Sequence, residues 1–141
     1  MRREEIIEKL KKSRIKVTPQ RLAICEIVFS SREHPTAYQV YEKVKKIHPS
    51  ISPATVYSTL HLLSKIGLIQ EMGFSNGISR FDSNISPHIN LVCLNCGRIE
   101  DYRSKDFENL WAEIIREIGS RPIGQRIDLY IKCNKCTNTV P

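Results

Sequence analysis

Four of the five cysteines of this 141-residue chain fall into two pairs of identical spacing, and these pairs constrain the fold more than any other feature. They are Cys93-Leu94-Asn95-Cys96 and Cys133-Asn134-Lys135-Cys136. Each C-x-x-C pair can direct two thiolates at one metal ion, and two pairs complete the closed tetrahedral site of a structural zinc. In a cytosolic chain two disulfides are the weaker interpretation, because thiols stay reduced there. The pattern therefore predicts one structural zinc that joins two distant segments.

The residues around these pairs indicate a small α+β unit. Alternating apolar positions predict a first strand through Ile89, Leu91 and Cys93, a second near Ile99, and a last one through residues 127–131. A helix is expected over residues 106–118, ended by Gly119, with an apolar face of Phe107, Leu110, Trp111, Ile114 and Ile118. A unit of about fifty residues buries little surface, so it needs a metal, a partner subunit or both.

The first part of the chain indicates four helices and a hairpin. Helices are predicted over residues 3–14, from Thr18-Pro19, from Thr36, and from Ser52-Pro53 to Gly67, because these residues suit helix caps and first turns. In the third helix the expected buried side includes Val40, Val44 and Ile47. Asn76-Gly77 then indicates a β-hairpin. Helices and a two-stranded ribbon in this order predict a winged helix-turn-helix.

The helix after Ser52 has two contrasting faces. Val56, Leu60 and Leu63 recur at helical spacing and are expected to face the core. The opposite face has no acidic residue and consists of Ala54, Thr55, Tyr57, Ser58, His61 and Lys65. An exposed surface helix would more often carry Glu, whereas a small polar face suits the DNA major groove.

The net excess of positive charge is confined to the first half of the sequence. Residues 1–80 hold 14 Lys and Arg against seven Asp and Glu, whereas residues 81–141 hold eight of each. The first half is therefore the candidate polyanion-binding module, the alternative being a solvated basic face without a partner. Neither a signal-peptide core nor a run of eighteen apolar residues occurs, so we expect a cytoplasmic protein without membrane contact.

These observations predict an α+β protein with three parts. Residues 1–82 form a winged-helix DNA-binding domain, residues 83–88 a short polar hinge, and residues 89–141 a zinc-stapled dimerisation domain. The closed four-thiolate site leaves no open position for a substrate, so we predict no catalytic residue there. Cys25 lies on an apolar helix stripe and is expected to be a core residue.

The ordered set of motifs resembles the ferric uptake regulator family nearly from end to end. Its pieces are residues 18–21 (TPQR), 34–37 (HPTA), 54–57 (ATVY), 79–82 (SRFD) and the two cysteine pairs. The resemblance implies a homodimer that binds double-stranded DNA at inverted-repeat operators, usually as a repressor, when a sensory metal is bound.

The resemblance also implies a sensory metal site with ligands from both predicted domains. They are His34, Asp82, His88, Asp101 and, where the family normally has histidine, Asn90. Two imidazoles and two carboxylates suit a divalent ion such as Fe²⁺, Mn²⁺ or Zn²⁺. An amide oxygen is a weaker ligand than imidazole, so we expect either lower affinity or another group in the place of Asn90.

Asp101, in place of glutamate, resembles the peroxide-sensing branch of the family. That likeness implies oxidation of His34 or His88 after bound Fe²⁺ reacts with peroxide. The alternatives are a zinc- or iron-uptake regulator without peroxide sensing, a protein-binding winged helix, and a zinc hydrolase that acts on nucleic acid. The sequence gives the hydrolase interpretation little support, because it contains no phosphate-binding glycine loop, no nucleophile elbow and no H-E-x-x-H motif.

The expected DNA contacts divide into two groups. Tyr57 is the first candidate for a base contact, because its ring can meet a thymine methyl group and its hydroxyl a base edge. Mixed base and phosphate contacts are expected from the rest of the polar face, namely Ser52, Thr55, Ser58 and His61. Phosphate contacts are expected from basic residues, namely Lys11, Lys12, Arg14, Lys16, Arg21 and, on the wing, Arg80.

Overall fold

The computed structural model describes residues 1–74 and 76–137, so the last four residues of the predicted dimerisation domain lie outside the described residues. It divides into two compact units, unit 1 (Met1–Ile85) and unit 2 (Ser86–Pro141). The division falls within residues 83–88, the segment that the sequence indicates as a hinge. Helices and small sheets together give the predicted α+β class.

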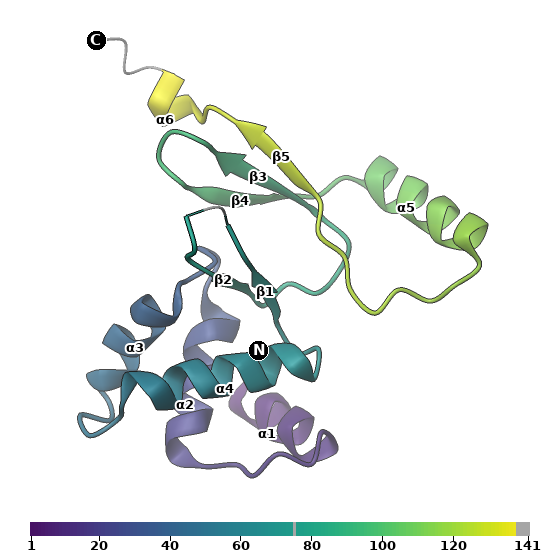
Figure 1. The fold of residues 1–141 in the computed structure, drawn as a ribbon. Coiled ribbons are helices and arrows are strands. Elements are labelled where there is room, and N and C mark those ends of the chain that lie inside the picture. The colour runs from purple at the N-terminus through teal and green to yellow at the C-terminus, as the bar shows by residue number, and fades with distance from the viewer. Residues whose placement is uncertain (75, 138–141) are drawn as a thin grey trace. The chain divides into compact units, whose positions relative to one another are not determined.

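Unit 1 contains four helices followed by a hairpin (Figure 1). The helices are α1 (Arg3–Lys12), α2 (Pro19–Ser30), α3 (Ala37–Lys45) and α4 (Pro53–Lys65). The predicted caps are confirmed, because Thr18, Thr36 and Ser52 each accept the backbone N–H three residues on, at 3.2, 3.1 and 3.1 Å. Gln39 completes a capping box by accepting the Thr36 N–H at 2.9 Å.

The hairpin pairs β1 (Gln70–Met72) with β2 (Arg80–Asp82) in antiparallel register. Because β1 ends at Met72 and β2 begins only at Arg80, the connection is longer than the two-residue turn that Asn76-Gly77 indicates. The chain before α3 also joins this hairpin. Phe81 N–H donates to the Pro35 carbonyl at 2.9 Å, and Thr36 bridges to Arg80. The segment around residue 34 is therefore anchored to the end of β2.

The core of unit 1 is continuous and draws on every helix. Fifteen buried side chains form one cluster, among them Ile6, Leu22, Val40, Leu60 and Phe81. Cys25 belongs to this cluster, as predicted, and burial raises the pKa of its thiol to about 12. The prediction that Ile47 is buried is wrong. Helix α3 ends at Lys45, so Ile47 leaves the helical stripe and is 60% exposed.

Unit 2 contains a three-stranded sheet in the order β4-β3-β5. Its strands are β3 (Ile89–Cys93), β4 (Ile99–Tyr102) and β5 (Asp128–Ile131). The β3–β4 pair is antiparallel, whereas β5 runs parallel to β3 because α5 (Lys105–Ile118) lies in the connection between β4 and β5. A short helix, α6 (Asn134–Thr137), follows β5.

Helix α5 is strongly amphipathic but buries none of its side chains. Ser104 caps it by accepting the Phe107 N–H at 3.1 Å, and Gly119 ends it in the left-handed conformation at φ 68°. Its apolar residues include Leu110, 53% exposed, and Ile118, 61% exposed. The helix lies beyond one end of the unit 2 sheet rather than across its face (Figure 1). Within residues 86–137, its apolar face is therefore left partly or largely exposed.

Candidate metal centres and DNA-binding face

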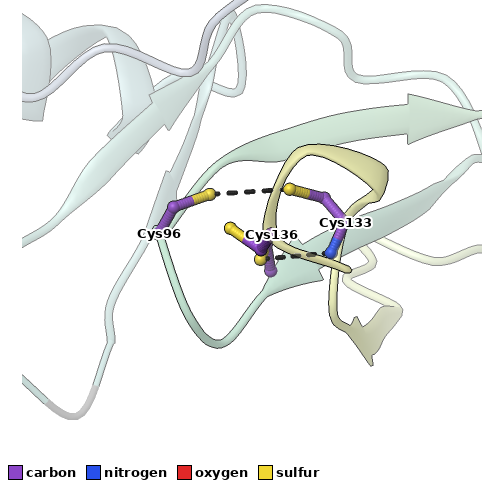
Figure 2. Close-up of side chains that lie close together, drawn as sticks. Cys96, Cys133 and Cys136 are labelled. Atoms are coloured by element: carbon purple, nitrogen blue, oxygen red, sulfur yellow. Dashed lines mark hydrogen bonds between the residues drawn. The ribbon is translucent and has the colours of Figure 1, made fainter. Parts of the chain in front are cut away.

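The four paired cysteines converge at one end of the unit 2 sheet. Cys93 ends β3, Cys96 lies in the turn after it, and the second pair lies at α6. One sulfur from each residue falls within 4.8 Å of the other three. Figure 2 shows Cys96, Cys133 and Cys136 of this cluster. Gly97 lets the first turn close, because its φ of 72° belongs to the left-handed region.

The sulfur spacing fits zinc rather than a disulfide. Cys96 Sγ and Cys133 Sγ lie 3.7 Å apart, the dashed contact in Figure 2. A disulfide would need about 2.05 Å. Four ligands at about 2.3 Å from one ion would place their sulfurs about 3.8 Å apart. The composition and spacing of the cluster therefore match a closed Cys₄ zinc site, as the sequence predicts.

Backbone donors favour thiolate at this cluster. The Cys133 N–H donates to Cys93 Sγ at 3.3 Å, and with the N–H of Cys96 it lowers the pKa of Cys93 to about 6. The Arg98 N–H lowers the pKa of Cys96, but the neighbouring thiols Cys93, Cys136 and Cys133 together raise it to about 11. Without metal, Cys93 rather than Cys96 is therefore the thiolate of the first pair. An arriving cation would displace the remaining thiol protons.

In unit 1, His34 lies beside Asp82. His34 Nε2 and Asp82 Oδ2 are 3.7 Å apart, and both residues are buried. His34 has a φ of 48°, a left-handed backbone conformation that is uncommon for a residue other than glycine. Arg80 donates to the His34 carbonyl and, at 2.8 Å, to the Glu33 carbonyl, which secures this conformation. Strained backbone of this kind concentrates at functional sites.

In unit 2, His88 lies beside Asn90 and Asp101. His88 Nε2 is 3.1 Å from Asn90 Oδ1 and 3.8 Å from Asp101 Oδ1. The other ring nitrogen, Nδ1, is 2.8 Å from the Ser86 carbonyl oxygen. Because a carbonyl only accepts, Nδ1 donates and Nε2 faces the oxygen ligands. A backbone carbonyl on the far nitrogen is the usual arrangement of a metal-binding histidine.

The exposed face of α4 has the composition that the sequence indicates. Tyr57 is 52% exposed, and Ser58, His61 and Lys65 lie on the same open side, whereas Val56, Leu60 and Leu63 are fully buried. Some of the polar groups already have partners. The Ser52 and Thr55 hydroxyls lie 2.9 Å apart, and His61 Nδ1 lies 3.6 Å from Glu71 Oε2.

The predicted phosphate contacts differ in how they are placed. Lys11, Arg14 and Lys16 are exposed, and Lys12 forms an exposed ion pair with Glu8 at 2.7 Å. Arg21 turns its guanidinium back to the Lys16 carbonyl. Arg80, the predicted phosphate contact of the wing, donates to the Glu33 and His34 carbonyls within unit 1. Its structural role is therefore to hold the loop before α3.

The structure adds an aromatic groove beside α4 that the sequence analysis missed. Its cavity of about 310 Å³ is lined by Ala37, Tyr38, Tyr41, Pro53, Ala54 and Tyr57. Tyr38 is 68% exposed, and Lys45 Nζ lies 5.4 Å from the centre of the Tyr41 ring. An exposed tyrosine off the apolar stripe of α3 is the only signal in the sequence, because the groove requires α3 and α4 to be brought together.

None of the helices within residues 1–74 and 76–137 has the length and hydropathy needed to cross a membrane.

Comparison with known proteins identifies the family. The model of the Ferric uptake regulator family matches residues 3–130. The chain is 33% identical to the peroxide operon regulator of Bacillus subtilis (strain 168) over 134 residues, which cover 95% of this chain and 92% of that protein. It is 36% identical to the solved Campylobacter jejuni peroxide stress regulator, with a TM-score of 0.73 over 92% of this chain and 98% of that one.

The ferric uptake regulator of Helicobacter pylori has the same fold, with a TM-score of 0.78 at 22% identity over 97% of this chain and 95% of that one.

The chain therefore belongs to the ferric uptake regulator family, whose members are metal-dependent, dimeric, DNA-binding transcription regulators. This assignment confirms the resemblance, the fold class and the regulatory function that the sequence predicts. It also removes the nucleic-acid hydrolase as an alternative, because the relatives are regulators rather than enzymes.

Proposed function

We propose that this chain is a cytoplasmic homodimeric repressor that binds inverted-repeat operators and is controlled by a divalent metal, in the response to peroxide. The Cys₄ cluster holds a structural zinc, and a second, exchangeable ion binds at His34, Asp82, His88, Asn90 and Asp101. The observation that carries the proposal is the orientation of the two histidine side chains, His34 and His88. In each unit, a histidine nitrogen faces a carboxylate and the surrounding backbone holds its residue in place.

The ligand chemistry supports one shared ion. Unit 1 supplies an imidazole and a carboxylate, and unit 2 supplies an imidazole, a carboxylate and an amide oxygen. Neither half alone has enough ligands to hold a divalent ion tightly, whereas five nitrogen and oxygen ligands suit Fe²⁺, Mn²⁺ or Zn²⁺. Asp82 and His88 are six positions apart in the sequence, so a metal that binds both constrains the short connection and with it the DNA-binding units of a dimer.

Binding of DNA is supported by the face of α4 and by charge. Unit 1 carries the excess of basic residues, and the exposed side of α4 has no acidic residue. Tyr57, which is exposed, would contact bases, and Ser52, Thr55, Ser58 and His61 would make the contacts around it. Lys11, Lys12, Arg14 and Lys16 are the phosphate contacts, and Arg21 a minor one because its guanidinium already has a backbone partner.

Dimerisation is supported by the uncovered face of α5. In a lone chain none of the five apolar residues of this helix is buried, and Leu110 and Ile118 are more than half exposed; such a face marks a protein interface. A second copy supplies a matching face, because homodimers of this size are usually symmetric.

A role in peroxide sensing is supported by relatives that are named for it, at 32–36% identity. With Fe²⁺ held by His34 and His88, hydrogen peroxide would transfer one oxygen atom to an imidazole ring and leave as water. An oxidised histidine is a poor ligand, so the ion would leave and the protein would release DNA.

The test is elemental analysis of the purified protein, with and without added Fe²⁺ or Mn²⁺, while binding to duplexes selected from a random library is measured. We expect one tightly held zinc per chain and a second ion that raises DNA affinity. His34→Ala should lose the second ion and keep the zinc. Iron and peroxide should then add the mass of one oxygen atom to a peptide that contains His34 or His88. One zinc and no second ion under any condition would refute metal sensing.

A further inference from the structure

Asn90 is buried in the central strand of the unit 2 sheet, and both ends of its amide have partners. Its nitrogen Nδ2 donates to Asp128 Oδ1 at 3.1 Å, and its oxygen Oδ1 lies 3.1 Å from His88 Nε2. Two ligands at about 2.1 Å from one ion and at right angles to each other lie about 3 Å apart. The amide oxygen therefore has the spacing of a neighbouring ligand to His88.

Asp128 lies beside Asn90 because β5 runs parallel to β3, with these two residues in register. Its side chain is itself held in place. Arg126 donates to Asp128 Oδ2 through Nε at 2.9 Å and through Nη2 at 2.7 Å. Such a charge-assisted pair is strong and directional. One carboxylate oxygen is thus bound by Arg126, and the other is left to accept from Asn90.

This arrangement decides which end of the Asn90 amide faces His88. An ionised carboxylate only accepts hydrogen bonds, so the amide must turn its NH₂ group to Asp128 and its oxygen away from it. With the opposite orientation, two oxygens would face each other at Asp128 and an NH₂ group would face the metal position. An NH₂ group cannot act as a ligand there.

We propose that Arg126 and Asp128 are positioning residues that present Asn90 Oδ1 as an oxygen ligand of the sensory ion. The inference rests on the proposed metal-sensing function. With Asn90 the site has two nitrogen and three oxygen ligands, a harder set than one with a third imidazole. Oxygen ligands suit Mn²⁺, whereas imidazole suits Zn²⁺, so Arg126 and Asp128 bias the site towards Mn²⁺.

The decisive variant is Asp128→Asn, which has almost the same shape. Arg126 can donate only to the single oxygen of the new amide, so the NH₂ group of that amide faces Asn90. Asn90 must then rotate and present its own NH₂ group to the metal. We expect a 10–100-fold loss of Mn²⁺ affinity, the usual effect of removing an outer partner of a metal ligand. The Co²⁺ absorption spectrum should change to that of Asn90→Ala.

The experiment measures Mn²⁺ affinity and the Co²⁺ spectrum of zinc-loaded protein for five chains: wild type, Asn90→Ala, Asp128→Asn, the double variant and Arg126→Gln. Arg98→Gln is the matched control, because it breaks an exposed unit 2 ion pair with Glu100. Zinc content and circular dichroism identify any variant that fails to fold, and Arg126→Gln then provides the independent test. The double variant should lose no more than Asn90→Ala.

Three outcomes would overturn the inference and leave metal sensing intact, and a fourth would overturn both. Wild-type affinity and spectrum in both Asp128→Asn and Arg126→Gln would show that Asn90 needs no positioning. If the losses of Mn²⁺ affinity in Asn90→Ala and Asp128→Asn add in the double variant, Asp128 does not act through Asn90. A wild-type spectrum in Asn90→Ala would show that the amide is no ligand, although metal sensing would survive. If wild-type protein binds neither Mn²⁺ nor Co²⁺ besides its zinc, metal sensing fails as well.

Discussion

Unit 1 and unit 2 are held together by different means, although one chain of ordinary composition forms both. Unit 1 buries one cluster of fifteen apolar side chains that comes from all four helices and the hairpin. Within residues 86–137 of unit 2 the buried apolar residues are Val92, Ile99 and two cysteines of the metal cluster, and α5 buries none. We therefore expect unit 1 to fold on its hydrophobic core, and unit 2 to need a metal and a second subunit.

The largest effect should follow from removal of the zinc. Structural zinc contributes about 10–16 kcal/mol in small zinc-dependent domains, which is as much as the whole stability of a typical domain. Cys96→Ala, or a strong chelator, should unfold unit 2 and leave unit 1 folded. Hydrogen exchange should show amides of β3–β5 unprotected and those of α2–α4 unchanged. Cys25→Ala is the control and should keep its zinc. If the β3–β5 amides stay protected in zinc-free protein, unit 2 does not need zinc to fold.

Lowering the pH should also remove the zinc, gradually rather than in one step. In the metal-free cluster the pKa of Cys93 is lowered to about 6, below its ordinary value of 9.0, so its thiolate favours the folded state above pH 9 and loses that contribution as the pH falls through 6. Protons also compete with zinc for all four thiolates. We expect zinc release below about pH 6, monitored with a zinc-binding dye. If zinc release did not depend on pH between about 4 and about 7, thiolate ligation would be contradicted.

A core truncation should act on unit 1 alone. Leu60 is fully buried, so Leu60→Ala removes packed atoms and leaves a cavity that costs about 2–5 kcal/mol. The protection of α2–α4 amides should fall by that amount, while zinc content stays the same. Ile85→Ala, at a position that is 54% exposed, should change little. Equal losses in both variants would mean that unit 1 lacks a specific core.

The cap of α5 should matter less. Ser104→Ala removes the acceptor of the Phe107 N–H and should cost about 1 kcal/mol of helix stability. Because α5 buries none of its side chains within the described residues, the loss should appear as weaker dimerisation in analytical ultracentrifugation. Ser120→Ala, just beyond the end of the helix, is the control. An unchanged dimer together with frayed α5 amides would show that this helix is not at the interface.

The smallest effect should come from a single phosphate contact. Lys16→Ala should weaken binding to all duplexes and lower the slope of log K against log salt by about one. Lys132→Ala, in unit 2, should leave the slope unchanged. Equal slopes for wild type and Lys16→Ala would remove Lys16 from the DNA-binding face and weaken the assignment of that function to unit 1.

Much of the fold follows from local rules. The helix starts at Thr18, Thr36 and Ser52 occur where the sequence places them, because a cap depends only on residues three positions apart. The burial of Ile47 was predicted wrongly, because periodicity does not show where a helix ends. The long hairpin loop was missed for a related reason, since Asn-Gly favours a turn without fixing where the strands pair.

The sequence by itself determined the two classes of chemistry in this protein. Two C-x-x-C pairs specify a tetrahedral thiolate site, and an acid-free helix face in a basic half specifies a partner with negative charge. Only the tertiary structure decided the roles of Arg80, Arg126 and Asp128. Each of these residues acts on a residue that is distant in the sequence, through a strand register or a loop contact. A pattern of neighbouring residues cannot encode such a pairing, because the folded backbone creates it.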